Sequence, residues 1–367
     1  MEVSKRVVKT LQELIRIDSS KGIQSISDYV QRELEEVGLK VRRDRDGNLL
    51  SEIGEGEGFL LNAHLDTVKA EWEGAFSARI VGGRVYGRGA SDCKAGVATM
   101  IEIARLLEEE KLSNRVVFTF TGNEEDKPLE MNGAYKLARK IKARRGLVLE
   151  PTAREDGSIG ISVGCRGSYR FRVDVLGKSC HSAHPERGEN AIYNAFKFIE
   201  SFRKMKKPER KILGEEVSAT ASITQIEAKE GVNVIPGKCS LSIDYRALPE
   251  EDEREIVEKL DRICRGSLGK KYRLEKLSGI PGGVYKERSF LEECRKAVES
   301  VGCVPRVYFK KTRNDSAVFQ KHGGIGCYVM GPGIEEQAHK VNEYCSVDCL
   351  MRTTEAVRKV VWRYAVQ

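Results

Sequence analysis

Hydrophobic positions recur along this chain with two different spacings. Apolar residues return about every 3.6 positions, as on one face of a helix, in four early stretches: 3–17, 25–37, 94–110 and 133–142. Short apolar runs rich in β-branched and aromatic residues predict strands between them: 59–63, 116–120 and 147–149. Helices and strands that alternate in this way are typical of an α/β layered domain.

The pattern changes after Gly164. The stretch 167–175 alternates between apolar and polar residues, as a half-buried strand does. Further strands are expected at 218–226, 239–245 and 272–277, and amphipathic helices at 191–204 and 251–265. Two helices on one side of a four-stranded antiparallel sheet, the ferredoxin-like α+β arrangement, would make a compact unit of its own.

The last part of the chain returns to the first pattern. The turn-rich segment SGIPGG at 278–283 ends the α+β unit, and a helix, a strand at 325–330 and another helix follow. A chain of 367 residues is too long for one ordinary core. We therefore expect one α/β domain built from residues 1–165 and 280–367, with a second domain, 166–279, inserted into it.

Composition is that of a soluble globular protein, with 40% hydrophobic and 32% charged residues. No apolar run approaches the roughly 20 residues of a membrane span, and the N-terminus lacks the apolar core of a signal peptide. The ten cysteines include no CxxC pair, so we expect reduced thiols and a cytoplasmic location. The net charge of +8 comes without an aromatic-basic module, which disfavours nucleic acid and favours an anionic substrate or acidic partner.

Metal-ligand residue types stand at the ends of the predicted α/β strands. FLLNAH ends at His64, VVFTFTGNEE at Glu125 and LVLE at Glu150, while Asp92 precedes a helix and His339 follows the strand CYVMGPG. Strand ends of an α/β sheet meet at one edge, where ligand sites gather. Five such ligands exceed what one tetrahedral zinc needs and suit two ions that share a carboxylate.

Two neighbouring acids complete this expected site. Asp66, two positions after His64, is expected to accept the ring N–H of that histidine and so fix its tautomer. Glu124 precedes Glu125, and successive side chains at a strand end diverge. One glutamate can thus bind metal while Glu124 acts as the general base that hydrolysis of an amide requires.

Over nearly its whole length the sequence resembles the two-zinc peptidases and deacylases that include acetylornithine deacetylase, succinyl-diaminopimelate desuccinylase, glutamate carboxypeptidase and aminoacylase. The resemblance is carried by motifs in a fixed order: AHLDTV, GRGASDCKAGVATM, TGNEED, LEPT, GKSCHSAHPERGENAI, GVNVIPGKCSLSIDYR and AHKVNEY. It implies a catalytic α/β/α domain of the zinc-peptidase type with an inserted lid that also dimerises. It also implies two Zn²⁺ per chain, with Co²⁺ or Mn²⁺ as substitutes.

The resemblance implies a role for each matching residue. The implied metal ligands are His64, Asp92 as the bridging ligand, Glu125, Glu150 and His339, with Asp66 behind His64 and Glu124 as the base. His181 matches a lid histidine that, in dimeric relatives, reaches the active site of the other subunit and stabilises the oxyanion. Asn233 and Arg246 match lid residues that bind substrate. Where many relatives have a Gly-[Ser/Thr]-Asp loop this chain has KTRNDSAVF, so Arg313 becomes a candidate specificity residue.

The expected activity is hydrolysis of a linear amide bond in an N-acyl amino acid of arginine or lysine biosynthesis. The substrate class includes lysine or ornithine linked to a small acidic carrier protein. A carboxypeptidase or dipeptidase of the same fold is the alternative, and a non-enzymatic interaction protein on this scaffold is a more distant one. The remaining histidines, His184 and His322, are expected to be a structural and a surface residue.

Overall fold

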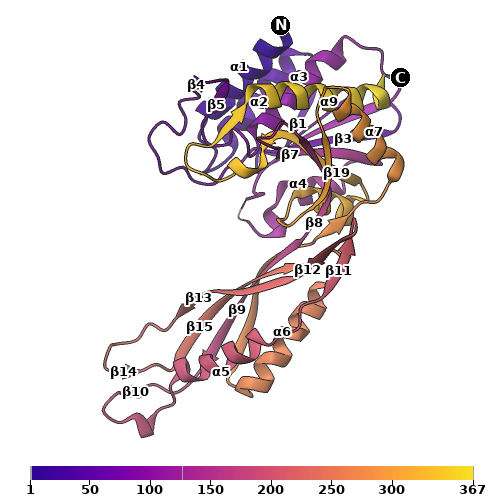
Figure 1. Cartoon of the computed structure of the whole chain (residues 1–367). Helices are drawn as coiled ribbons and strands as arrows, with labels where there is room; N and C mark the ends of the chain where they lie inside the picture. The colour runs from indigo at the N-terminus through magenta and orange to yellow at the C-terminus, as the bar shows by residue number, and fades with distance from the viewer. Residues whose placement is uncertain (1, 126, 367) are drawn as a thin grey trace. The chain divides into compact units, whose positions relative to one another are not determined.

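The computed structural model describes residues 2–125 and 127–366, and the chain divides into two compact units (Figure 1). Unit 1 comprises residues 1–164, 284–310 and 314–367, and unit 2 comprises 165–283 and 311–313. Within the described ranges, no helix is both long and apolar enough to cross a membrane. Every cysteine is a free thiol.

A nine-stranded mixed sheet forms the centre of unit 1. Its strand order is β1 (Val41–Arg43), β2 (Leu49–Ile53), β6 (Arg115–Thr121), β3 (Gly58–His64), β7 (Arg145–Ala153), β19 (Gly326–Ile334), β8 (Ile159–Cys165) and β17 (Gly283–Val284), with β18 (Pro305–Lys310) paired to β8. The four central strands β6, β3, β7 and β19 run parallel. Their carboxyl ends therefore share one edge of the sheet.

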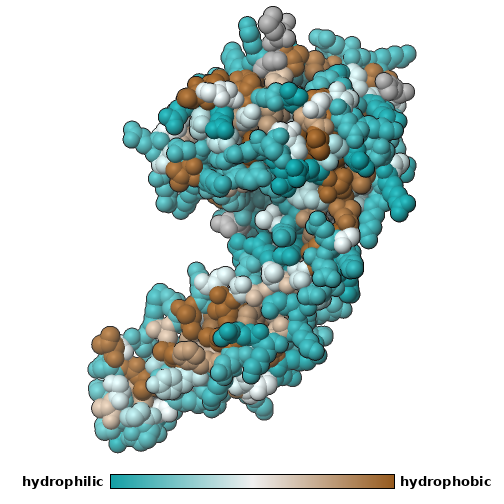
Figure 2. Space-filling model, in the orientation of Figure 1, coloured by the Kyte–Doolittle hydropathy of each residue, from teal (hydrophilic) through white to brown (hydrophobic). Residues whose placement is uncertain are grey.

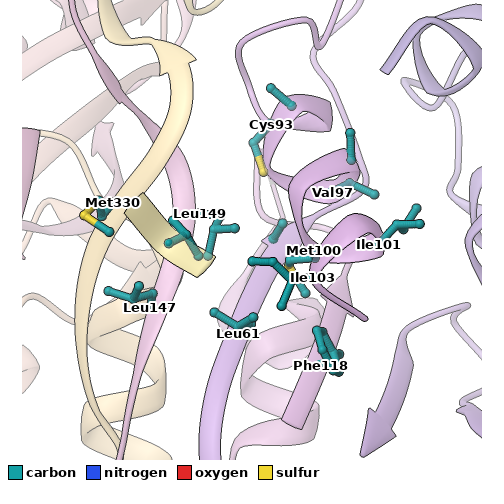
Figure 3. Packing of buried hydrophobic residues seen from close by; sticks show 14 of the residues in the cluster. Leu61, Cys93, Val97, Met100, Ile101, Ile103, Phe118, Leu147, Leu149 and Met330 are labelled. Carbon is teal, nitrogen blue, oxygen red and sulfur yellow. The ribbon is translucent and has the colours of Figure 1, made fainter. Parts of the chain in front are cut away.

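Helices cover both faces of this sheet. They are α1 (Glu2–Arg16), α2 (Gln24–Glu36), α3 (Lys94–Glu108), α4 (Gly133–Ala138), α7 (Arg288–Glu299), α8 (Asp315–Val318) and α9 (Val347–Ala365). Because strand side chains alternate, Leu61, Phe118 and Leu149 enter the core beneath α3 (Figure 3). The intervening residues are also buried, and α4 and α8 contact β6, β7 and β19. The result is an α/β/α sandwich.

Helix α3 lies unusually close to the sheet at its N-terminal end. A Cβ at Gly96 would stand 2.2 Å from the carbonyl oxygen of Leu149 on β7, so only glycine allows this approach. The helix is buried along most of its length, and Val97, Met100 and Ile101 pack in the core (Figure 3). This close packing fixes the start of α3, and the loop before it, next to the sheet edge.

Unit 2 is built on a four-stranded antiparallel sheet. Its elements in chain order are β9 (Gly167–Leu176), α5 (Ala191–Arg203), β13 (Thr220–Glu227), β15 (Lys238–Ala247), α6 (Glu253–Leu268) and β16 (Tyr272–Ile280). The spatial order β13-β15-β9-β16 is the ferredoxin-like order. Alternate residues of β9 and β15 are buried, and α5 and α6 contact the sheet. An antiparallel pair, β10 (Cys180–His181) with β14 (Val234–Ile235), and the hairpin β11 (Glu209–Ile212)/β12 (Glu215–Ser218) complete it.

The fold class expected from the sequence is confirmed, with local differences. Helix α4 ends at Ala138 instead of residue 142, because the chain turns there and the Lys140 N–H bonds the Leu137 carbonyl. Strand β8, which is buried throughout, was not expected, since its Gly and Ser residues dilute the apolar signal.

Apolar surface is visible over β13 and β15 of unit 2 (Figure 2), where Ile226 is 54% exposed.

Candidate metal centre

The expected ligands of unit 1 gather at the carboxyl edge of its parallel strands. His64 is the last residue of β3, and Glu124 and Glu125 follow β6, the neighbouring strand. Asp92 lies in the loop before α3, and His339 follows the short helix η4 (Glu335–Gln337) after β19. Neighbouring parallel strands and one tightly packed helix thus bring residues from four parts of the sequence to one edge.

Asp92 lies at the middle of this arrangement. One carboxylate oxygen, Oδ1, is 3.0 Å from Nε2 of His64, and the other, Oδ2, is 3.3 Å from Nε2 of His339. The His339 nitrogen is also 3.0 Å from Oε2 of Glu125. A carboxylate that presents one oxygen to each of two histidines has the arrangement of a bridging ligand.

The donor atoms fit a pair of metal ions. Among the described residues, two groups have ligand atoms that all lie within 4.8 Å of one another: His64, Asp92 and Cys93, and Asp92, Glu125 and His339. Both contain Asp92, and imidazole nitrogen with carboxylate oxygen is a donor set that zinc accepts. Cys93 is set apart from the others because its thiol donates to the His64 carbonyl oxygen at 3.4 Å and burial raises its pKa to about 11.

Glu150 has one oxygen in use and one available. Its Oε2 is 3.0 Å from Nζ of the buried Lys310, whereas its buried Oε1 has no hydrogen-bond partner in the described part of the chain. A buried carboxylate oxygen without a partner is costly unless a cation or donor reaches it. Glu150 lies within β7, which continues to Ala153, instead of at the strand end that the sequence predicted. It belongs to neither of the two close groups.

Asp66 makes contacts that differ from the predicted ones. The ring Nδ1 of His64 is 2.9 Å from the backbone carbonyl oxygen of Asp66 and 3.7 Å from its nearest carboxylate oxygen, which is beyond hydrogen-bond range. The carboxylate instead accepts the backbone N–H groups of Glu124 at 3.2 Å and Glu125 at 3.1 Å. Because β3 ends at His64, Asp66 lies beyond the strand and does not share its alternation. It fixes the tautomer with its backbone and the glutamate pair with its side chain.

The glutamate pair stands in a strained turn. Asn123 adopts a positive φ of 61° just after β6, a conformation that asparagine tolerates better than most residues. His339 has a φ of 65°. Glu124 directly precedes Glu125 in the chain, and its 6% exposure shows that the residue is shielded from bulk water.

Protonation of the ligands follows from their surroundings. Hydrogen bonds to Asp92 and then to Glu125 raise the pKa of His339 to about 10. Burial raises the pKa of Glu125, although the His339 bond opposes it. Burial would also raise the pKa of Asp92, but hydrogen bonds from His339 and His64 outweigh it and lower that pKa. Contacts of the two histidine rings with Asp92 and Glu125 thus hold these groups together where cations would fit.

Glu343 is an essential support that the sequence reading did not find. It is fully buried, and it accepts the guanidinium N–H of Arg88 at 2.7 Å and the backbone N–H groups of Gly89 at 3.1 Å, Ser91 at 2.8 Å and Asp92 at 3.0 Å. Four donors on one carboxylate fix the loop that carries Asp92. Its only sequence signal was its place in the AHKVNEY motif.

The other expected residues belong to unit 2. His181 in β10 is exposed, and its Nδ1 accepts the Ala183 N–H at 3.1 Å. The Asn233 carbonyl accepts the Ser182 N–H at 2.8 Å, so these two lid candidates lie close together. Arg246 on β15 pairs with Asp244 at 2.7 Å. Arg313 groups with unit 2 by its contacts.

Arg166, at the start of unit 2, is a further basic residue that the sequence reading missed. It is 9% exposed, and its Nε has no hydrogen-bond partner within the described ranges. Burial and then the nearby Arg246 lower its pKa. The two arginines therefore form a positive pair within unit 2. His184 is exposed, while burial lowers the pKa of the half-buried His322, which packs edge-on against Tyr135 instead of lying at the surface.

The fold and this cluster are those of a metal-dependent amidohydrolase. Residues 60–363 match peptidase family M20/M25/M40, and the chain belongs to that family. The resemblance stated from the motifs is thereby confirmed.

Relatives of known name cover most of the chain. Acetylornithine deacetylase of Myxococcus xanthus is 28% identical over 381 residues, 96% of each protein. A protein of Staphylococcus aureus (strain Mu50 / ATCC 700699) named as a probable succinyl-diaminopimelate desuccinylase is 28% identical over 354 residues, 84% of each. A protein of Aeropyrum pernix assigned as a LysW-lysine/LysW-ornithine hydrolase is 26% identical and covers 94% of this chain and 92% of its own.

Solved structures show the same fold. The M20 family metallo-carboxypeptidase Sso-CP2 of Sulfolobus solfataricus has a TM-score of 0.83 at 18% identity and covers 98% of this chain and 99% of its own. The YXEP protein of Bacillus subtilis, described as a dinuclear metal binding peptidase, has a TM-score of 0.75 at 17% identity, with 98% and 97% covered.

Proposed function

We propose that this protein hydrolyses the linear amide bond of an N-acyl amino acid with two zinc ions bound by His64, Asp92, Glu125, Glu150 and His339. The observation that carries the proposal is the Asp92 carboxylate, with one oxygen facing each of two histidines. The Oε1 atom of Glu150, which has no hydrogen-bond partner among residues 2–125 and 127–366, would provide the additional ligand. Co²⁺ or Mn²⁺ would substitute for zinc, since both accept the same donors.

In this proposal each residue near the scissile bond has one task. Two zinc ions, when bound, polarise the carbonyl and make water a stronger acid. Glu124 takes the proton of the attacking water and returns it to the departing amine. Asp66 holds Glu124 and Glu125 in place through their backbone N–H groups. His181 serves as the oxyanion donor: its Nδ1 accepts a hydrogen bond, so a neutral ring carries its proton on Nε2.

The proposed substrates are N-acyl amino acids of arginine or lysine biosynthesis, including lysine or ornithine bound to an acidic carrier protein. The names of the full-length relatives support this choice over peptide substrates. We also propose that the protein acts in the cytoplasm, because free thiols such as its ten cysteines stay reduced there. Asn233, Arg246 and Arg313 are proposed to contact the substrate.

The general base is tested by Glu124→Gln. We expect kcat to fall by ~10²–10⁴-fold or more while two zinc ions per chain remain bound, because the amide keeps the shape but cannot take a proton. Zinc content by atomic absorption and turnover of N-acetylornithine, succinyl-diaminopimelate and dipeptides are measured together. Glu130→Gln, at an exposed glutamate, is the control. Near-normal turnover in Glu124→Gln would show that another residue is the general base. A preference of the wild type for dipeptides would contradict the proposed N-acyl amino acid substrates.

Unit 2 is further proposed to form a homodimer. Tyr193 and Phe196 on α5 are 69% and 58% exposed, and Ile226 on the edge strand β13 is 54% exposed. Apolar residues on a helix and an unpaired strand edge are features of interfaces. We expect light scattering to give the wild type a mass of twice the 41.1 kDa of one chain. The Phe196→Glu variant should have the mass of a single chain. Lys206→Glu, at an exposed lysine after the same helix, should leave the dimer intact.

A further inference from the structure

A cavity of about 660 Å³ lies beside the metal centre, entirely within unit 1. Its walls come from the α1–α2 loop, the β1–β2 turn, the loop after β3 and the residues that follow β6. It shares Asp66 and Glu125 with the metal centre. A group placed in this cavity would therefore lie next to the reacting amide.

Four cations line this cavity: Lys21, Arg45, Lys69 and Lys127. We call them the cation cluster. All four are exposed, and none forms an ion pair with a residue that the structure describes. They come from four separate segments of the chain, so they do not reflect one basic stretch of sequence.

The acids that line the cavity in the described part of the chain do not neutralise the cluster. Asp46 is 2.7 Å from Lys136, outside the cluster. Asp66 is engaged by two backbone N–H groups, and Glu125 faces His339. The cluster therefore keeps an excess of positive charge, which attracts an anion.

Two buried hydroxyl groups add an independent sign of a ligand. Ser19 is 1% exposed and Thr67 is 4% exposed, and both line the cavity. Neither side-chain oxygen has a hydrogen-bond partner within the described ranges. Buried hydroxyls normally find a partner, and a carboxylate would accept a short hydrogen bond from each.

We propose that this cavity is a subsite for one or more substrate carboxylates that lie beyond the scissile amide, and that the cation cluster sets this specificity. The inference rests on the proposed amide hydrolysis and narrows its substrate class from any N-acyl amino acid to one with an anionic group. The carboxylates come either from a dicarboxylic acyl group or from an acidic protein that carries the amino acid. Both sources present the same chemistry to the cluster.

The test is the triple variant Lys21→Ala/Arg45→Ala/Lys69→Ala of the zinc-loaded full chain. Its matched control is Lys142→Ala/Lys296→Ala/Lys321→Ala, which removes three exposed cations outside the cavity. Values of kcat/KM are compared for N-acetyl, N-succinyl and acidic-peptide-linked forms of one amino acid. The cluster variant should lose about tenfold on an anionic substrate and change less than about twofold on the N-acetyl one. The control should change neither.

The pattern of losses identifies the source of the carboxylates. A lower kcat/KM of the cluster variant on the N-succinyl substrate would show that the subsite binds a dicarboxylic acyl group. A lower kcat/KM on the peptide-linked substrate alone would show that it binds an acidic protein. Raising the salt from about 0.05 M to about 0.5 M should reproduce the loss in wild type, because these cations are exposed. Equal losses on acetyl and anionic substrates, or no loss at all, would overturn the subsite.

Binding separates this inference from the proposed function. Succinate and acetate are titrated calorimetrically into the zinc-loaded wild type and both variants. Tighter binding of succinate in wild type and control, lost in the cluster variant, supports the subsite even if none of the amides is hydrolysed. Equal binding of the two acids by wild type would overturn the subsite and leave amide hydrolysis untouched.

Discussion

Asp92 shows how much one side chain can organise. His64 and His339 are far apart in the sequence, yet each approaches a different oxygen of this carboxylate. Asp66 is used just as fully, with its carbonyl on the His64 ring and its carboxylate on the backbone of two glutamates. An alanine at position 66 would keep the backbone carbonyl contact but lose both side-chain contacts, and an amide at position 92 would replace one of the two carboxylate oxygens with a donor.

The buried pair of Lys310 and Glu150 allows a stability test of the metal centre. Lys310→Met leaves the Glu150 carboxylate buried without its cation, and removal of one partner of such a pair costs ~3–5 kcal/mol. We expect a loss of about 3 kcal/mol in urea unfolding of the metal-free chain and a smaller loss in the zinc-loaded chain, because a bound cation neutralises the same carboxylate.

The neighbouring exposed Lys311 supplies the control, since Lys311→Met should change neither unfolding curve. Equal destabilisation of the metal-free and zinc-loaded chains by Lys310→Met would remove Glu150 from the ligand set.

At the scale of elements, the loop before α3 depends on a contact from the other end of the chain. Glu343→Gln replaces an oxygen that accepts N–H groups with an amide that donates, and four donors converge there. Because Asp92 would lose its support, we expect zinc affinity to fall by ~10–100-fold in chelator competition. Glu336→Gln, at a glutamate 44% exposed, should keep wild-type affinity. An unchanged affinity in Glu343→Gln would limit Glu343 to a structural role.

Elements in which apolar residues recur at regular spacing could be predicted from the sequence, and elements fixed by contacts with distant segments could not. The expected starts of α1, α2, α3 and α5 lie within one residue of those observed, because each has apolar residues at helical spacing. Short or glycine-rich strands such as β8 and β17 carry no such signal and form because a neighbouring strand is present.

The same distinction holds for the site. His64, Asp92, Glu125 and His339 could be expected to meet, since strand ends converge. Glu343 holds Asp92 from 251 positions away in the sequence, and Lys310 pairs with Glu150 from 160 positions away, so no local pattern gives either pairing. The backbone acceptor chosen by His64 depends on where β3 ends, which a pattern predicts only within a few residues.

At the scale of the whole molecule, the acid stability of the chain contains a contribution from unit 2. Burial would raise the pKa of Asp174, but hydrogen bonds from Lys238, Ser240 and Arg172 outweigh it and lower that pKa from 3.8 to about 2. The folded state thus gains stability at pH values above 3.8, and this gain disappears as the pH falls toward 2.

Asp174→Asn measures this contribution. We expect the variant to be less stable by about 1 kcal/mol near pH 6, a value reduced for solvent screening, and the difference to vanish as the pH approaches 2. Thermal or urea unfolding of both full chains across this range gives the difference. The comparison variant is Asp156→Asn, which removes an exposed ion pair with Arg306 in unit 1. A pH-independent difference for Asp174→Asn would contradict the assignment.

The position of β19 has a consequence for how the protein is made. Strands β7 and β8 leave the ribosome early, and β19, which lies between them in the sheet, follows only after the whole of unit 2. During synthesis the sheet therefore lacks the strand between β7 and β8. The edges of these two strands that will pair with β19 stay unpaired, next to the future metal centre. A nascent chain stopped before residue 326 should be recognised by chaperones. Zinc should bind only after β19 has paired with β7 and β8.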